Sequence, residues 1–212
     1  MEFSEKEREI VYQAIFNRRD VRSEFQDRPV PDEVIRRILD AAHHAPSVGF
    51  MQPWDFIVVR DLEVRRQIKA AFQDANAVGA TRFEGERREK YNSLKLEGIL
   101  DAPMGICITC DRTRNGPSVL GKAQNPEMDL YSTVCAVQNL WLAARAENLG
   151  AGWVSIIDHD RLKQILQVPD QMTLVAYLCI GYVDFFHEKP QLEKAGWLSR
   201  IELDQLIHFD GW

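Results

Sequence analysis

The feature that most constrains the fold of this chain is the uninterrupted apolar run MGICITC at residues 104–110. An apolar run of this length predicts a strand buried in the protein interior. Helical and strand patterns alternate around it, which indicates a domain that combines a sheet with helices. Further strands are predicted at residues 55–60, 151–156 and 173–183. Helices are predicted after Ser4, which forms a capping-box pattern with Glu7, after Pro31, and at 62–72, 128–148 and 159–166. The pattern at 128–148 is the longest, so it predicts a central helix that stops before Gly150.

The domain organisation follows from length and from the absence of any linker. The chain has 212 residues, with no internal repeat and no stretch rich enough in Pro, Gly or Ser to divide it. We therefore expect one α+β domain over residues 1–212. The last segment, about 184–212, mixes polar and aromatic residues without a uniform period, and we expect it to be an arm that packs on another subunit. The charged stretch 81–97 is either an exposed helix or a mobile cover over a site.

The charge and the N-terminus exclude several classes of protein. A net charge of −6 argues against a broad surface for nucleic acid, which needs a basic face. The start MEFSEKEREI lacks the basic and apolar regions of a signal peptide, and no apolar run approaches the roughly 18 to 20 residues of a membrane span. We expect a cytoplasmic protein without a membrane or nucleic-acid partner.

The four cysteines include one C-x-x-C pair, Cys107 and Cys110, which raises the question of a zinc or redox site. Positions three apart in a strand point to opposite faces, so the two thiols would not share one metal ion. We expect buried, reduced cysteines and no metal. No G-x-x-x-x-G-K-[ST] loop occurs, and the G-x-G at Gly150 follows a helix and opens a strand, opposite to the order of a dinucleotide fingerprint.

Three arginines and one aspartate gather in NRRDVRSEF at residues 17–25. Arg18, Arg19 and Arg22 lie at the predicted end of the first helix, where cations complement the helix dipole. The same guanidinium groups match phosphate oxygens, so they would equally form an anion site. The residues alone leave both interpretations open.

This segment, together with AAHHAPSVGFMQPWDFIVV and NLGAGWVSI, resembles the FMN-dependent nitroreductase-like superfamily, and the resemblance spans nearly all of residues 5–205. It implies an α+β sandwich with a central, mostly antiparallel sheet flanked by helices. It also implies a homodimer with exchanged terminal arms and two FMN sites at the subunit interface. The implied phosphate ligands are Arg18, Arg19, Arg22 and Arg200; Pro46, Ser47, Val48 and Gln52 would line the ring and ribityl chain; and Gly152 would let the backbone approach the flavin closely.

Two departures from the superfamily pattern are informative: Asp20 replaces the usual serine between the arginines, and Ser155 lies where the flavin ring is expected. With these two residues, the chain resembles the branch of the superfamily that consumes reduced FMN and oxygen and forms 5,6-dimethylbenzimidazole and erythrose 4-phosphate. That resemblance implies that Asp20 and Ser155 are catalytic, Asp20 as a base near the ribityl chain and Ser155 as a hydrogen-bond partner of the flavin. The alternatives are an Asp20 salt bridge to Arg19 or Arg22, and a Ser155 satisfied by the backbone.

A flavin-consuming enzyme would receive reduced FMN from a separate NAD(P)H-dependent flavin reductase. Two other functions fit the same arginine and A-P-S motifs. One is an NAD(P)H-dependent FMN nitroreductase or flavin reductase. The other is a non-catalytic flavin-binding protein, because arginines that hold a phosphate indicate binding and not turnover.

Overall fold

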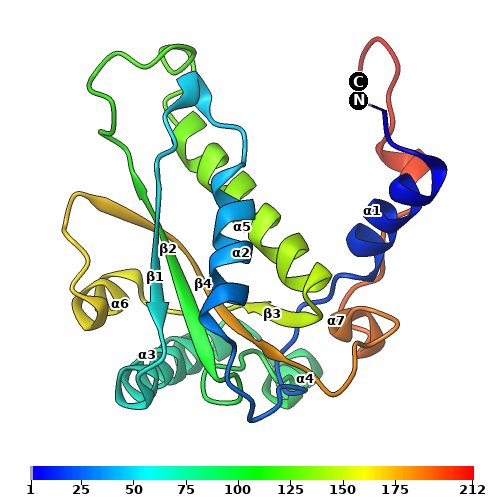
Figure 1. Ribbon diagram of the computed structural model, residues 1–212. Helices are drawn as coiled ribbons and strands as arrows, with labels where there is room; N and C mark the ends of the chain where they lie inside the picture. The colour runs from blue at the N-terminus through cyan, green and yellow to red at the C-terminus, as the bar shows by residue number, and fades with distance from the viewer. Residues whose placement is uncertain (1) are drawn as a thin grey trace.

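The computed structural model describes residues 2–212, and its centre is a four-stranded sheet (Figure 1). The strands are β1 (Trp54–Val59), β2 (Met104–Asp111), β3 (Leu149–Trp153) and β4 (Met172–Tyr182). Their order across the sheet is β1-β2-β4-β3, and every neighbouring pair is antiparallel. The predicted α+β class with an antiparallel sheet is therefore confirmed.

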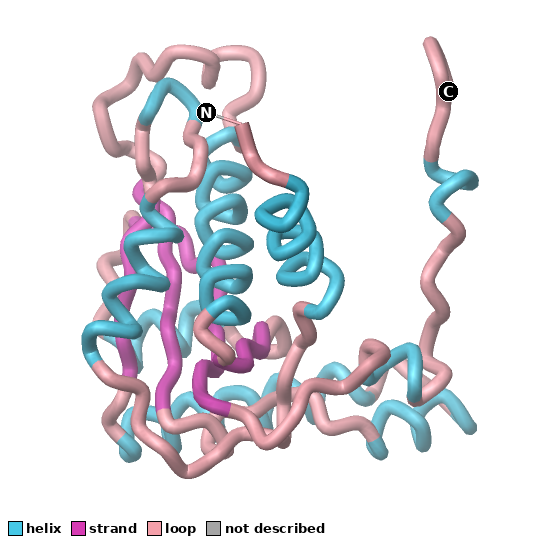
Figure 2. The backbone as a smooth tube through the Cα atoms, turned by 45° about the vertical axis from the view of Figure 1, so that its right-hand side comes forward, coloured by secondary structure: helices cyan, strands magenta, loops and turns pink. Residues whose placement is uncertain are grey.

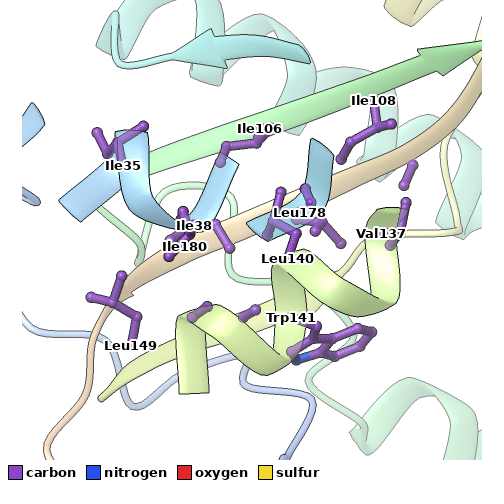
Figure 3. Packing of buried hydrophobic residues seen from close by; sticks show 14 of the residues in the cluster. Ile35, Ile38, Ile106, Ile108, Val137, Leu140, Trp141, Leu149, Leu178 and Ile180 are labelled. Carbon is purple, nitrogen blue, oxygen red and sulfur yellow. The ribbon is translucent and has the colours of Figure 1, made fainter. Parts of the chain in front are cut away.

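Helices cover both faces of this sheet. The long α5 (Met128–Ala146) and α2 (Asp32–His43) pack on one face, where apolar residues of all four strands meet them, some of which are shown in Figure 3. On the other face, α3 (Leu62–Ala80) and α6 (His159–Leu166) cover a second apolar cluster, and α4 (Gly85–Ser93) packs against α3. Two short 3-10 helices, η1 (Val48–Phe50) and η2 (Leu203–Leu206), and the four-residue α7 (Gln191–Lys194) complete the fold.

The apolar run at 104–110 is explained by this layering. Ile106 and Ile108 of β2 face α2 and α5 (Figure 3), whereas Cys107, between them, lies in the cluster beneath α3. Successive side chains of a strand point to opposite faces, so a strand covered on both sides needs apolar residues at every position. Cys110, three positions after Cys107, is held near Thr133 of α5, so the two thiols do lie on opposite faces.

Several predicted boundaries and one burial prediction change in the structure. Residues 159–166 form α6 as predicted, but α3 continues eight residues beyond position 72, to Ala80. The central helix ends at Ala146, and Gly150 is already inside β3, where a Cβ atom would meet Val183 Cγ1 at 2.5 Å. Cys135 is exposed on α5, so the expectation that all four cysteines are buried was wrong.

The two ends of the chain project from the body on the same side in Figure 1, and Figure 2 shows the C-terminal segment standing apart from the sheet and its helices. The first helix, α1 (Glu5–Asn17), begins with the predicted capping box, in which Ser4 N–H donates to Glu7 Oε2 at 2.8 Å. None of its residues is buried, so the apolar stripe along α1 faces no core of its own chain. Within residues 2–212, no helix combines the length and the apolarity needed to cross a membrane.

Candidate functional site

The structure brings four of the predicted site residues around one cavity of about 900 Å³. Arg18, Arg19 and Asp20 lie on one side, where the chain leaves α1, and Arg200 reaches the cavity from the C-terminal segment. Gln138 of α5 also lines the cavity. We call this the arginine pocket. It joins residues about 180 positions apart in the chain, which sequence spacing alone does not predict.

Two guanidinium groups of the arginine pocket have donors that no acceptor of residues 2–212 uses. Among residues 2–212, neither Arg18 nor Arg200 forms an ion pair or a side-chain hydrogen bond. Arg18 lies over the indole ring of Trp141, with its Cζ 4.7 Å from the ring centre. Burial lowers the pKa of Arg18; the charge of Asp20 opposes this shift, and the charges of Arg19 and Arg200 add to it. Glu188, Glu193 and Glu202 also line the pocket, so the pocket as a whole is not cationic. The donors of Arg18 and Arg200 fit a phosphate group that lies between them, and such an anion would relieve the repulsion between these two cations.

Arg19 differs from Arg18 because its guanidinium N–H groups already donate to backbone carbonyls of the protein. Its Nε donates to the His187 carbonyl at 2.8 Å, and another donor binds the Glu188 carbonyl. A third donates to the carbonyl oxygens of Phe16, at 2.7 Å, and Arg18, at 2.8 Å. Arg19 therefore fastens the start of the C-terminal arm to the end of α1, and its phosphate-binding role stays a prediction.

Asp20 is held in place by both of its carboxylate oxygens. Oδ2 accepts hydrogen bonds from Arg22, at 2.8 Å from Nε and 2.5 Å from a terminal nitrogen. Oδ1 accepts the backbone N–H of Trp153 at 3.0 Å, at the end of β3. Arg22 also donates to the Lys95 carbonyl at 3.1 Å. The salt bridge that orders Arg22 is present, while proton transfer by Asp20 and phosphate binding by Arg22 stay predictions.

Gly152 allows a close approach of another backbone segment, and in the structure that segment is part of the protein itself. A Cβ at this position would lie 2.0 Å from the Val21 carbonyl oxygen. The segment that carries Asp20 runs beside β3, with Val21 N–H donating to the Ala151 carbonyl at 3.0 Å. Only glycine lets the two backbones lie this close. The predicted approach to flavin at Gly152 stays a prediction.

Ser155 lies two residues beyond Trp153, past the end of β3 rather than inside the strand that was expected to continue to 156. Its side chain is exposed and has no hydrogen-bond partner among residues 2–212. Val154 N–H still donates to the Tyr177 carbonyl at 2.9 Å, which continues the register of β3 on β4 by one residue, and Ser155 lies beyond this bond. The hydroxyl is therefore available to a ligand, though it does not line the arginine pocket.

The predicted ring-binding loop lies at the opposite end of α5. Val48 N–H donates to Ser132 Oγ at 3.0 Å, and Ser47 Oγ accepts the Gln52 N–H at 3.1 Å. Ser132 precedes Trp141, which lies beneath Arg18, by nine positions of α5, or about 13 Å along the axis. Pro46 is exposed, and Gln52 lines a separate groove of about 860 Å³ beside α2 and β1. One chain thus does not bring Pro46, Ser47, Val48 and Gln52 to the arginine pocket.

Two residues of the pocket region were missed by the sequence reasoning. These residues are Gln138 and Trp141, both on α5. The indole N–H of Trp141 donates to the Arg19 carbonyl at 3.2 Å, and its ring supports Arg18. Gln138 and Trp141 are three positions apart, so they lie on one face of the helix. This i, i+3 spacing of a polar and an amphipathic residue is the sequence signal that could have identified them.

Comparison with known proteins assigns the fold to a family. A model described as Nitroreductase family matches residues 15–182. The chain belongs to the nitroreductase family. Two curated members are 5,6-dimethylbenzimidazole synthases. The Rhodospirillum rubrum protein is 44% identical over 183 residues, which cover 86% of each chain. The Rhodobacter capsulatus protein is 38% identical over 201 residues, covering 95% of this chain and 97% of its own length.

Solved structures of the nitroreductase family agree with the fold. An iodotyrosine deiodinase bound to FMN and 3-iodo-L-tyrosine superposes with a TM-score of 0.75 at 20% identity, covering 95% of this chain and all of that chain. A nitroreductase-type protein from Desulfovibrio desulfuricans, solved in complex with FMN, gives a TM-score of 0.65 at 26% identity, covering 95% of this chain and 97% of that chain.

Proposed function

We propose that this chain is an oxidoreductase that fragments reduced FMN with oxygen, forming 5,6-dimethylbenzimidazole, the lower ligand of vitamin B12, and erythrose 4-phosphate. The observation that carries the proposal is the similarity, at 44% and 38% identity over most of both lengths, to two 5,6-dimethylbenzimidazole synthases. The pair Asp20 and Ser155 distinguishes it from a flavin-recycling relative. Both lie at the end of β3, where Asp20 binds the Trp153 N–H two residues before Ser155.

The arginine pocket suits the phosphate of FMN. A phosphate monoester carries about −1.5 to −2 charges at neutral pH. The unpaired guanidinium groups of Arg18 and Arg200 provide charge-assisted donors for it, and Arg18 is held on Trp141 in advance. The pocket volume of about 900 Å³ exceeds what a phosphate needs, which leaves room for part of the ribityl chain.

Reduced FMN supplies the electrons for oxygen and the carbon atoms of the product, and the residues of this chain hold it and move protons. Asp20 is our candidate base for a proton of the ribityl chain, because its carboxylate borders the arginine pocket and is fixed by two partners. Arg22 donates from Nε and from a terminal nitrogen to Asp20 Oδ2, which fixes the orientation of the carboxylate. Ser155 offers a free hydroxyl for a hydrogen bond to the flavin.

A homodimer accounts for the split between the two groups of predicted residues. Ser132, which contacts the 46–52 loop, precedes Gln138 of the arginine pocket by six positions of α5 in one chain, or about 9 Å along the axis. In our proposal the loop of one subunit lines the ring of the flavin whose phosphate is held by the other subunit, and the arm at about 184–212 packs on the partner. The unburied face of α1 and the exposed apolar residues of the arm provide the surface for this contact.

The supply of reduced FMN completes the proposal. We assign it to a separate NAD(P)H-dependent flavin reductase, with molecular oxygen as the co-substrate. We place the reaction in the cytoplasm, where free thiols such as the buried Cys107, Cys110 and Cys179 stay reduced.

The deciding experiment incubates the purified protein with photoreduced FMN in air and measures 5,6-dimethylbenzimidazole and erythrose 4-phosphate by mass spectrometry. We expect both products in equal amounts, and none with oxidised FMN or without oxygen. Fast oxidation of NADH or NADPH with intact flavin and no benzimidazole would replace the proposal with a nitroreductase or flavin reductase. Flavin that binds and survives repeated reduction and reoxidation would identify a non-catalytic flavin-binding protein.

A further inference from the structure

Arg200 reaches the arginine pocket from a segment whose attachments to the body, among residues 2–212, lie at Gly196 and Trp197. Of residues 194–212, every one is exposed except Trp197, which is half-buried. The chain is fastened earlier by Arg19, at the carbonyls of residues 187 and 188, and by Gln191, whose amide donates to Glu24 Oε1 at 2.8 Å. Trp197 is therefore the last fixed point before Arg200.

The position of Trp197 is set by the way α7 ends. Gly196 has φ +66, and its N–H donates to the Glu193 carbonyl at 2.9 Å. The N–H of Trp197 donates to the Leu192 carbonyl at 2.8 Å. These two bonds are those of a Schellman motif, in which a glycine in the left-handed region ends the helix and the next residue makes an apolar contact. Glycine thus turns the chain so that Trp197 points to α4.

The side chain of Trp197 rests in a seat formed by α4 and the residues before it. The ring centre of Phe83 lies 5.3 Å away in an edge-to-face arrangement, and that of Tyr91 lies 6.4 Å away. The guanidinium of Arg87 lies over the indole, 5.1 Å from its centre, and Lys90 Nζ donates to the Gly196 carbonyl. The edge-to-face aromatic contact and the cation–π contact both depend on the orientation of the indole, so together they fix the position of Trp197.

This seat limits where Arg200 can lie. Arg200 lies three positions after Trp197, so the anchor keeps the two Cα atoms within about 10 Å. Without the indole, this part of the arm keeps only the exposed Lys90 bond to the Gly196 carbonyl, and the next side-chain anchor is Gln191, nine positions before Arg200. The local concentration of a tethered group falls with roughly the −3/2 power of the tether length, so a tether that extends back to Gln191 gives a loss of up to about fivefold.

We propose that Trp197 is a positioning residue for the phosphate of FMN: by occupying its seat on α4, it holds Arg200 over the arginine pocket, opposite Arg18. The proposal rests on the proposed function, because it takes FMN as the ligand of that pocket. In this proposal the charged α4 segment supports substrate binding through Trp197 and does not itself contact the substrate.

The test compares the affinities of the full-length protein for oxidised FMN and for riboflavin, which lacks the phosphate, by quenching of flavin fluorescence. We expect Trp197→Ala to weaken FMN binding about fivefold while riboflavin binding changes less than twofold. Trp197→Phe, which keeps an aromatic ring for the seat, should restore most of the FMN affinity. Trp212→Ala, at the exposed chain end, is the matched control and should leave both affinities unchanged.

A double variant shows whether Trp197 acts through Arg200. In an Arg200→Ala background, Trp197→Ala should have no further effect on the ratio of the two affinities, because the group it positions is absent. Equal losses for FMN and riboflavin, or additive effects in the double variant, would overturn the proposal. If wild-type protein does not prefer FMN to riboflavin, the proposed function fails; if it does and Trp197→Ala keeps that preference, the positioning role alone is wrong.

Discussion

Asp20 combines two properties that a positioned base requires, since each carboxylate oxygen has its own partner and the group borders the arginine pocket. Asp20→Asn keeps the shape of the side chain and one acceptor for the Trp153 N–H, but it removes the charge and the proton-accepting oxygen. We expect FMN affinity within about threefold of wild type and product formation at least about 100-fold slower. Single-turnover assays with reduced FMN measure both.

Asp27→Asn is the control for Asp20→Asn, because Asp27 is an exposed carboxylate on the same segment with no hydrogen-bonded partner among residues 2–212. It should leave the rate unchanged. A wild-type rate from Asp20→Asn would remove this residue from proton transfer and leave it the salt bridge to Arg22 alone.

Gly152 controls the position of Asp20 through the backbone. Gly152→Ala places a Cβ 2.0 Å from the Val21 carbonyl oxygen, and neither backbone has a flexible end that would move aside. We expect a loss of about 2–3 kcal/mol in the free energy of unfolding and a melting temperature lower by about 5–10 °C. Gly211→Ala, where no atom lies within 4 Å, should leave the melting temperature unchanged. Equal melting temperatures for the two variants would contradict the close approach.

The arginine cluster shows how much of the site the sequence could predict. The residue types in NRRDVRSEF indicated an anion site, and the resemblance added Arg200. The sequence could not show that Arg19 binds the carbonyls of residues 187 and 188, which lie 168 and 169 positions away, or that Arg18 forms no ion pair or side-chain hydrogen bond among residues 2–212. Pairing of a side chain with distant backbone is a property of the tertiary structure.

At the scale of elements, the sequence predicted the helix ends that are specified by residues close together in the chain. The capping box before α1 and the bounds of α6 agree with the structure because caps and apolar periodicity act within a few residues. The end of β3 was predicted three residues late, since VSI continues a strand-like pattern after Trp153. The strand stops where its pairing with β4 stops, and β4 lies about 20 residues further along the chain.

Asp129 fastens the loop between β2 and α5 to the start of α5. Its side chain is fully buried, and its Oδ2 lies 2.5 Å from Lys122 Nζ and 3.2 Å from Arg112 Nε. Burial by itself would raise the pKa of Asp129, but the hydrogen bonds from Lys122, the Leu130 N–H and Arg112 outweigh it, and the pKa is lowered. The ionised carboxylate therefore contributes to the stability of the fold.

We expect Asp129→Asn to lower the free energy of unfolding by about 2–4 kcal/mol at neutral pH, because two cations then lose a buried partner. A lowered pKa stabilises the folded state above the unfolded value, about 3.9 for aspartate, and this contribution is lost as pH falls below it. The difference between wild type and variant should thus be constant above about pH 5 and shrink toward pH 3. Urea denaturation across this range measures it; a pH-independent difference would show that the charge of Asp129 does not stabilise the loop.

At the scale of the molecule, the body and the two ends of the chain differ in how they are packed. The sheet and its helices enclose two apolar clusters, one on each face. By contrast, α1 and the last residues of the chain carry large apolar side chains that remain exposed, including Phe16 at 70% and Phe209 at 86%. Exposed apolar residues gathered on one side of a molecule indicate a surface that is covered in the assembled protein.

This packing predicts a stable dimer that depends on the ends of the chain. Phe16→Asp places a charge in the apolar surface of α1, and burying that charge in an interface costs far more than the small effect of an exposed helix substitution. We expect wild type to sediment with twice the mass of the chain and Phe16→Asp to shift the equilibrium toward the monomer at micromolar concentration. Val78→Asp, which places the same charge on α3 where Val78 is 64% exposed, should remain dimeric.

Because the proposed flavin site takes the 46–52 loop from the partner, FMN binding should weaken with dissociation and recover as protein concentration rises. Dimers of Phe16→Asp as stable as wild type would locate the interface away from α1.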